Sequence, residues 1–171
     1  MNKLISNTLR FLILVFVQVF LLKNTIIYGL NVPYLYILFI LLLPFETPNW
    51  LLFLLAFLMG ITIDLFNDTL GLHATACTML ALFRILLISI TVQKDNYDHD
   101  PEPSLSLMGF RWFFFYVLIL TFIHHFFLLN FEVFKISEIG STLSRVILSS
   151  IFTVILIFVS ELLFFKKKQR K

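Results

Sequence analysis

The chain has 171 residues, of which 60% are hydrophobic, 17% are aromatic and only 13% are charged, and its formal net charge is +3. A soluble domain typically carries roughly 25% charged and 45–50% apolar residues. This composition excludes a soluble enzyme, a nucleic-acid-binding protein and a disordered chain, because each of these needs more polar surface than the sequence can supply. We therefore expect a single polytopic membrane domain over residues 1–171, made almost entirely of its membrane spans.

The apolar runs are long and unbroken, which favours helices over the alternating strands of a membrane barrel. Because about 20 helical residues cross the hydrocarbon core, we predict an all-α membrane protein with six transmembrane helices. The spans are expected at about 8–22, 33–45, 50–66, 70–92, 110–131 and 143–165.

The run at 33–45 is short for a span, and prolines lie at both of its ends, Pro33 and Pro44. If this run fails to cross, five spans remain and the two termini lie on opposite sides of the membrane. We prefer six spans, because six spans obey the positive-inside rule, which counts Lys and Arg in the short cytoplasmic segments. With six spans and cytoplasmic termini, the outer side holds only Lys23 and Lys135, and the inner side holds Lys3, Arg10, Lys94, Arg111 and the tail cations.

Two polar segments are expected on the cytoplasmic side. The loop 93–109 carries acidic residues and prolines and has too few apolar residues to build a core, so it is predicted to be a solvated loop. The tail 166–171 is predicted to bind anionic lipid, at about 1 kcal/mol per basic residue near the membrane surface. Its cations are Lys166, Lys167, Lys168, Arg170 and Lys171.

Ionisable residues inside the spans are costly in lipid and are therefore the most informative positions. We expect an outer cluster of residues at similar depth, formed by Asp64, Asp68, His73 and Arg145, and an inner pair formed by Arg84 and Glu161. Simpler interpretations stay open. Asp68 fits a turn residue or a helix N-cap. Asp64 fits a structural hydrogen bond in the bundle rather than a role in ion or proton transfer. Arg84 and Glu161 fit a stabilising pair rather than a proton relay.

No catalytic or cofactor-binding pattern is present. The sequence lacks a glycine-rich phosphate loop, a His-Glu-x-x-His motif and a Gly-x-Ser-x-Gly motif. His124 and His125 are adjacent and point about 100° apart on a helix, so they suit one metal ion poorly, and Cys77 is the single cysteine. We therefore expect neither an enzyme nor a cofactor or metal site.

The turn between the third and fourth runs carries a recognisable pattern. The stretch 60–74 reads GITIDLFNDTLGLHA, that is, Gly60 and Asp64 four apart, a short turn, then Thr-Leu-Gly ending at Gly71, with Arg84 further along the next helix. This pattern resembles the MreD family of rod shape-determining proteins, particularly the form found in the Bacteroidetes group. Size, span number, the short second span and the basic tail agree over nearly the whole chain. One departure is Ile85, where family members often have proline after the arginine.

The resemblance implies a non-catalytic, multi-pass component of the bacterial inner membrane that works in the cell-wall elongation (rod) complex and determines cell shape. Implied partners are an MreC-like bitopic protein, an MreB-like actin homologue, and the peptidoglycan synthase and transpeptidase. The implied fold is similar to that of the S subunits of energy-coupling-factor transporters, so a small-molecule-binding transporter subunit is the alternative function. Gly60 and Gly71 would let a partner helix, or another helix of the same bundle, approach closely.

Overall fold

A computed structural model describes residues 3–23, 33–92, 102–133 and 139–163, and every regular element within them is helical. The all-α prediction is therefore confirmed for this part of the chain. Five helices are long and apolar enough to cross a membrane, with spans at Ile5–Leu22, Asn49–Asn67, Leu72–Thr91, Phe110–Val133 and Ile139–Leu163. The protein is accordingly a helical membrane protein of the multi-pass type.

The first span changes helical form along its length. It begins as the α-helix α1 (Lys3–Phe16) and continues as the π-helix η1 (Val17–Leu22). π-Helical turns are rare and often accompany a specific side-chain placement. Here the wider turn carries Gln18, which is buried although its neighbours along the span are half-buried or exposed.

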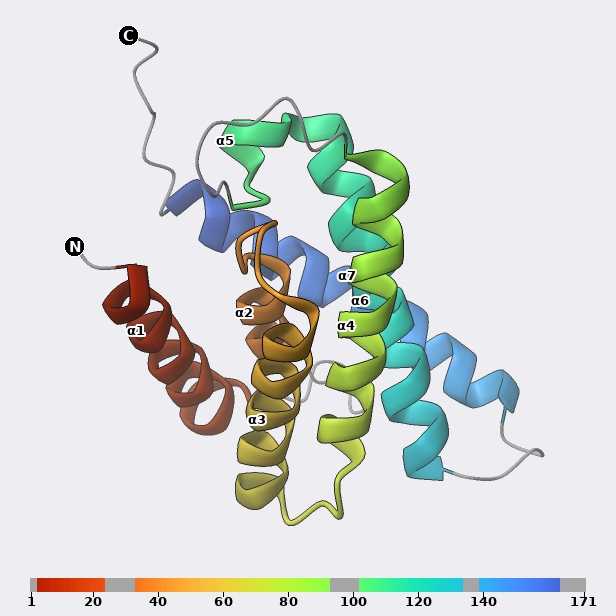
Figure 1. The fold of residues 1–171 in the computed structure, drawn as a ribbon. Coiled ribbons are helices and arrows are strands. Elements are labelled where there is room, and N and C mark those ends of the chain that lie inside the picture. The colour runs from red at the N-terminus through yellow and green to blue at the C-terminus, as the bar shows by residue number, and fades with distance from the viewer. Residues whose placement is uncertain (1–2, 24–32, 93–101, 134–138, 164–171) are drawn as a thin grey trace, which may run out of the picture.

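The remaining long helices form a layered bundle (Figure 1). α3 (Asn49–Asn67) packs against α4 (Leu72–Thr91), α4 against α6 (Phe110–Val133), and α6 against α7 (Ile139–Leu163). α1 lies beside α3, on the side away from α4 (Figure 1). The α3–α4 turn and the residues around Lys23 mark one end of the bundle, which we call the hairpin end. We call the opposite end the Arg10 end. It carries Arg10 of α1, Thr91 of α4, Arg111 of α6 and Glu161 of α7.

The second expected span is the main departure from the sequence prediction. Within 33–45 the only helices are the 3₁₀-helix η2 (Leu35–Ile37) and the single turn α2 (Leu38–Leu41). The prediction of a continuous helix over that run is wrong, because prolines bound it and side chains from other helices bind its backbone ends. We call residues 33–44 the central segment, since Tyr36, Ile37, Ile40 and Leu41 have no exposed surface at all.

Other boundaries differ by a few residues from the predicted ones. α7 starts at Ile139 rather than 143, α6 extends to Val133, and the cytoplasmic loop expected at 93–109 contains a short helix, α5 (Leu105–Met108). The rest of that loop up to residue 101, and the whole tail 166–171, lie outside the described residues. The loop is thus not wholly solvated, since Pro103 is buried beside α5.

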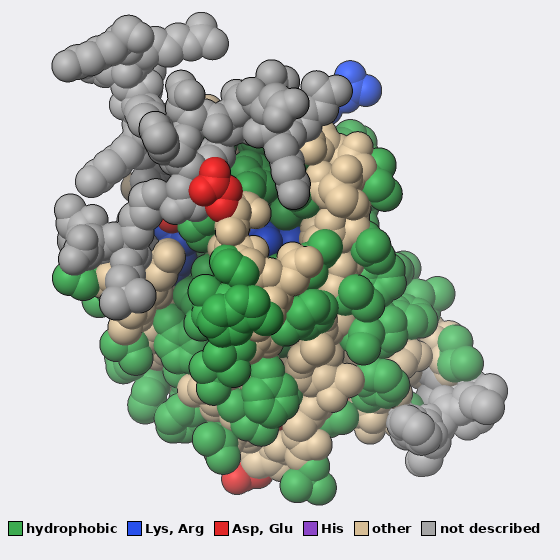
Figure 2. Space-filling model, in the orientation of Figure 1, with side chains coloured by type: hydrophobic (Ala, Val, Ile, Leu, Met, Phe, Trp, Pro, Cys, Tyr) green, Lys and Arg blue, Asp and Glu red, His purple; other side chains and the backbone are tan. Residues whose placement is uncertain are grey.

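The bundle surface is apolar. Figure 2 shows hydrophobic side chains over most of the visible face, with charged side chains in its upper part and at its lower tip. Large exposed hydrophobic residues occur on every long helix, including Phe20, Phe57, Leu86, Phe115 and Ile155. A surface of this kind is solvated by lipid rather than water.

Candidate functional site

The α3–α4 turn is closed by one buried carboxyl group, that of Asp64. Its Oδ1 accepts hydrogen bonds from the Thr69 hydroxyl at 2.5 Å and the His73 backbone N–H at 3.0 Å, and its Oδ2 accepts one from the Ala74 N–H at 2.9 Å. Three donors converge on the group, and no acceptor within the described residues does. This arrangement suits the ionised carboxylate, which only accepts, and places its charge at the positive end of α4.

The turn itself uses two left-handed residues. Asp68 ends α3 with φ 56°, and Gly71 precedes α4 with φ 80°. Asp68 is exposed and lies one turn beyond Asp64, where its side chain has no hydrogen-bond or ion-pair partner among the described residues. The two aspartates therefore differ in role: Asp64 binds the next helix, and Asp68 reverses the chain.

Close approach of the two helices depends on Gly60. A Cβ atom added there would lie 2.3 Å from the Ala74 Cα and 2.5 Å from the Ala74 nitrogen. Backbone atoms cannot rotate away as a side chain can, so α3 and α4 meet at a distance that only glycine permits at this position. The small-residue surface at Gly60 is thus used for packing within the bundle, which leaves no room there for a partner helix.

The central segment is held at its start by side chains from two helices. Gln18 donates to the Pro33 carbonyl at 3.1 Å and accepts from the Leu35 N–H at 2.9 Å. Thr153 of α7 accepts from the Tyr34 N–H at 3.0 Å. Non-helical backbone at membrane depth is tolerated only where protein groups satisfy it, and these contacts supply that satisfaction.

The end of the central segment is held by cations and a phenol. Arg84 donates to the carbonyls of Leu43 and Pro44, and its Nε donates to the Tyr116 hydroxyl at 3.1 Å. That hydroxyl donates in turn to the Leu41 carbonyl at 2.8 Å. The Tyr116 hydroxyl thus satisfies a carbonyl of the last turn of α2, and the guanidinium satisfies two carbonyls that follow the helix.

The predicted inner pair of Arg84 and Glu161 does not form. The Arg84 side chain is buried among the carbonyls at the end of the central segment, whereas Glu161 accepts a hydrogen bond from the Leu105 N–H at 3.4 Å. Unsatisfied carbonyls nearer to Arg84 replace the distant carboxylate as its partners. The ion pair at this end instead joins Arg10 of α1 to Glu102 at 2.8 Å, and Arg10 also donates to the Leu42 carbonyl at 3.3 Å.

The predicted outer cluster forms only in part. Asp64 and His73 meet through the His73 N–H, but Arg145 pairs with Glu132 at 3.8 Å and forms no ion pair with Asp64. The Asp64 carboxylate instead binds donors that lie nearer in the chain, the Thr69 hydroxyl in the turn and two backbone N–H groups of α4. The hypothesis that Asp64, Asp68, His73 and Arg145 form one cluster is therefore wrong.

A buried group of imidazole and phenol rings lies deeper in the bundle than the α3–α4 turn, and we call it the His–Tyr cluster. The Tyr36 hydroxyl lies 2.8 Å from Nδ1 of His73 and 2.9 Å from Nε2 of His124, so it is within hydrogen-bond distance of both imidazoles. His125 faces another way and contacts the Thr121 carbonyl at 2.8 Å and the Thr153 hydroxyl at 3.1 Å. The ring of Tyr34 packs edge-on against all three imidazoles.

A polar cavity of about 240 Å³ opens at the hairpin end next to this cluster. Its lining includes a cation, a carboxylate, an amide and an imidazole from four different elements. The lining residues are Gln18, Lys23, Tyr34, Asn67, Thr69, Leu72, His73, Leu128 and Glu132. The Lys23 ammonium donates to the Phe66 carbonyl, so the end of η1 is tied to the end of α3 at the cavity rim.

The described residues form no group of three or more His, Cys, Asp or Glu side chains that could hold a metal ion. No protein-family model, curated protein or solved structure matches this chain.

Sequence reasoning missed the side chains that hold the central segment, namely Gln18, Tyr116 and Thr153. Gln18 gave a usable signal, because an amide within an apolar run needs a partner in lipid. Tyr116 and Thr153 gave none, since a tyrosine among phenylalanines and a threonine in a helix are ordinary in a membrane span.

Proposed function

We propose that this protein is a non-catalytic membrane component of the bacterial cell-wall elongation complex, of the MreD type, and that it acts in the inner membrane by holding its partners. The proposal is supported by the structural roles of the four residues that carry the family resemblance. Gly60 allows α3 to touch α4, Asp64 binds the N-terminus of α4, Gly71 lets the chain turn, and Arg84 binds the end of the central segment.

Gly60, Asp64 and Arg84 contact backbone inside the bundle, and Gly71 supplies the left-handed turn. A motif used in this way makes a rigid hairpin and leaves no group free for acid–base or nucleophilic chemistry. The described mass outside the helices is small, so partners would be met through lipid-facing helix surfaces, where packing and small polar contacts drive association. The partners proposed are an MreC-like bitopic protein, an MreB-like actin homologue and the wall synthase and transpeptidase.

The proposal includes a topology of six crossings with both termini in the cytoplasm. Arg10 on α1 contacts the carbonyl of Leu42, which precedes α3 in the chain. The chain therefore runs away from the Arg10 end along α1 and returns to it by Leu42. This return supports a crossing by the central segment, short as its helices are. The basic tail would then lie at the cytoplasmic surface, where anionic lipid attracts it.

The topology can be tested by cysteine labelling. Cys77 is buried, and replacing it by alanine leaves a background without cysteine. In that background, Asp68→Cys is expected to react in intact cells with a membrane-impermeant maleimide, whereas Gln169→Cys is expected to react only after lysis. Labelling of both in intact cells, or of neither, would contradict the topology.

The function can be tested by depletion in the source organism. Rod-shaped cells are expected to become round, and a tagged chain is expected to retain an MreC-like protein on purification. Rescue is expected with the wild-type gene and with Gly140→Ala, a helix substitution that meets no atom within 4 Å, but not with Gly60→Leu. Cells that keep their shape after depletion would overturn the proposal.

The second candidate is a small-molecule-binding subunit of a transporter. The polar cavity at the hairpin end favours it, since charged and amide groups converge there on a space large enough for a small polar solute. Copurification with an ATPase module, together with a solute released on denaturation, would select this candidate over the scaffold.

A further inference from the structure

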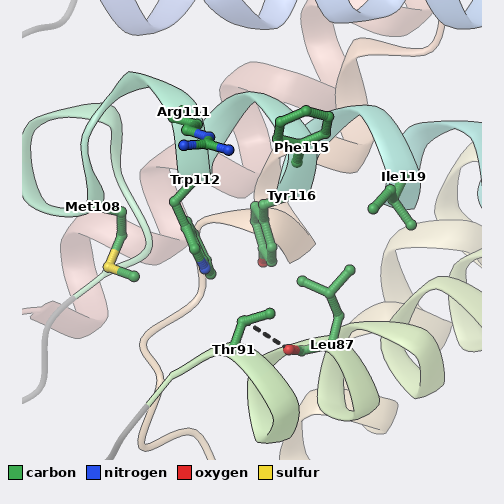
Figure 3. A pocket seen from close by; sticks show the side chains of 8 residues that line it. All are labelled: Leu87, Thr91, Met108, Arg111, Trp112, Phe115, Tyr116 and Ile119. Carbon is green, nitrogen blue, oxygen red and sulfur yellow. Dashed lines mark hydrogen bonds between the residues drawn. The ribbon is translucent and has the colours of Figure 1, made fainter.

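A second pocket opens between α4 and α6 at the Arg10 end, away from the motif residues. Its volume is about 410 Å³, within the range of small-ligand sites. Both helices are membrane-spanning in length and hydropathy, so the pocket opens sideways into the bilayer. Its lining residues are Leu87, Thr91, Met108, Arg111, Trp112, Phe115, Tyr116 and Ile119 (Figure 3).

The lining changes in polarity along the helices. Arg111 and Trp112 belong to the first turn of α6, and Thr91 is the last residue of α4. One to two turns deeper the walls are Leu87 and Ile119, which are wholly apolar. A cation and an indole at the helix ends, followed by an apolar interior, match the order of phosphate and acyl chain in a phospholipid.

Arg111 is the free cation of this pocket. It is exposed and forms no hydrogen bond or ion pair with any described residue, whereas Arg10, Arg84 and Arg145 each have a partner. The Thr91 hydroxyl donates to the Leu87 carbonyl at 2.7 Å, drawn as a dashed line in Figure 3, and forms no hydrogen bond with Arg111. A free guanidinium suits a phosphate, which it can bind through two parallel hydrogen bonds.

The pocket wall is held in place by the bundle. Trp112 stacks on Tyr116 with ring centroids 4.7 Å apart and an interplanar angle of 15°, and it meets Phe45 edge-on at 6.3 Å. Figure 3 shows both rings pointing from α6 toward α4. The Tyr116 hydroxyl binds the Leu41 carbonyl, so the stack rests on the central segment. A preformed wall lowers the ordering cost of a ligand.

We propose that this pocket binds one anionic phospholipid from the leaflet at the Arg10 end. The phosphate contacts the Arg111 guanidinium, and an acyl chain lies along Leu87 and Ile119 between α4 and α6. The site is separate from the attraction of lipid to the basic tail, which is diffuse, and it goes beyond the proposed scaffold function. The charge of Arg111 argues for this occupant, because an apolar partner helix would leave the guanidinium unpaired.

The two tryptophans of the chain allow a direct test, because Trp50 and Trp112 can each be made the sole reporter. The Trp50→Phe protein is reconstituted into phosphatidylcholine vesicles that contain increasing fractions of phosphatidylglycerol with brominated acyl chains, which quench tryptophan on contact. We expect brominated phosphatidylglycerol to quench Trp112 at about fivefold lower mole fraction than brominated phosphatidylcholine, the factor that one basic residue contributes at a membrane surface.

Three variants separate this site from other lipid contacts. The Trp112→Phe protein reports from Trp50, which is 69% exposed on α3, and is expected to be quenched equally by the two lipids. Adding Arg111→Gln to Trp50→Phe is expected to abolish the preference at Trp112. Replacing the cations of the tail 166–171 with glutamine is expected to leave that preference unchanged.

Equal quenching of Trp112 by the two lipids would overturn the proposal, as would a preference that survives Arg111→Gln or is lost with the tail cations. Loss of the preference in millimolar inorganic phosphate would assign the site to a free anion and would also overturn it. Native mass spectrometry of the unmodified chain gives a second measurement. It is expected to retain one phosphatidylglycerol, and Arg111→Gln to retain none.

Discussion

At two places inside the bundle, backbone groups at or near the end of a helix bind a charged side chain, and the two charges are opposite. At the start of α4 a carboxylate, Asp64, binds backbone N–H groups; just after the end of α2 a guanidinium, that of Arg84, binds backbone carbonyls. The carboxylate matches the partial positive charge of the α4 N-terminus, and the guanidinium matches the partial negative charge of the carbonyl oxygens. Both residues belong to the α3–α4 hairpin, so one hairpin closes its own turn and also the central segment.

The two sites differ in the distance along the chain over which they act. Asp64 reaches residues that follow it by nine and ten positions, whereas Arg84 reaches back over 41 and 40 positions. Loss of Asp64 should therefore disturb a local turn, whereas loss of Arg84 should release a buried segment. That segment is contacted by α1, η1, α3, α4, α6 and α7. The comparison predicts a larger effect at Arg84.

The largest effect is expected from Arg84→Ala. It leaves the carbonyls of Leu43 and Pro44 and the Tyr116 hydroxyl without their buried donor. We expect a loss of about 3–5 kcal/mol in the free energy of unfolding, because each buried acceptor left without a donor costs about 1–3 kcal/mol. Unfolding in mixed micelles with rising denaturing detergent measures it. Arg84→Lys keeps the charge and should recover part of the loss; a loss no larger than that of Asp64→Asn would contradict the comparison.

Gly60→Ala tests whether the hairpin can open to accommodate one methyl group. Because the added Cβ would lie 2.3 Å from the Ala74 Cα, the two helix backbones must separate. We expect a loss of about 3 kcal/mol, at the upper end of the overpacking range. Gly140→Ala on α7 is the matched control, since its Cβ would meet nothing within 4 Å, and the same unfolding assay should show no loss for it.

Asp64→Asn is expected to cost about 2 kcal/mol, because the new amide group presents a donor to backbone N–H groups and at least one of three hydrogen bonds is lost. Asp68→Asn, four residues later, removes the same charge from an exposed side chain and should cost less than ~0.5 kcal/mol. Equal losses for the two variants would show that charge at this end of the bundle, rather than the binding of α4, is what matters.

The same contrast explains what the sequence could predict. The spans, the tight α3–α4 turn and the importance of Asp64 follow from apolar runs and short-range spacing, which act over one or two helical turns. The partner of Arg84 could not be predicted in this way, because its carbonyls come from the central segment, whose short helices look like one short span. The sequence also gave no reason to place Tyr36 between His73 and His124, since those three residues come from different elements.

The smallest effects should come from the two left-handed residues of the turn, and they should have opposite signs. At Asp68, with φ 56°, glycine removes the steric cost that a side chain has in this conformation, so Asp68→Gly is expected to be neutral or to stabilise by up to about 0.5 kcal/mol. At Gly71, with φ 80°, an alanine would have open space around its Cβ but an unfavourable backbone, so Gly71→Ala should cost about 1 kcal/mol. Thermal unfolding in detergent measures both changes. Neither the Asp68 side chain nor Gly71 binds α4. If Gly71→Ala lowers the free energy of unfolding as much as Asp64→Asn does, the turn conformation, and not the carboxylate, holds the hairpin closed.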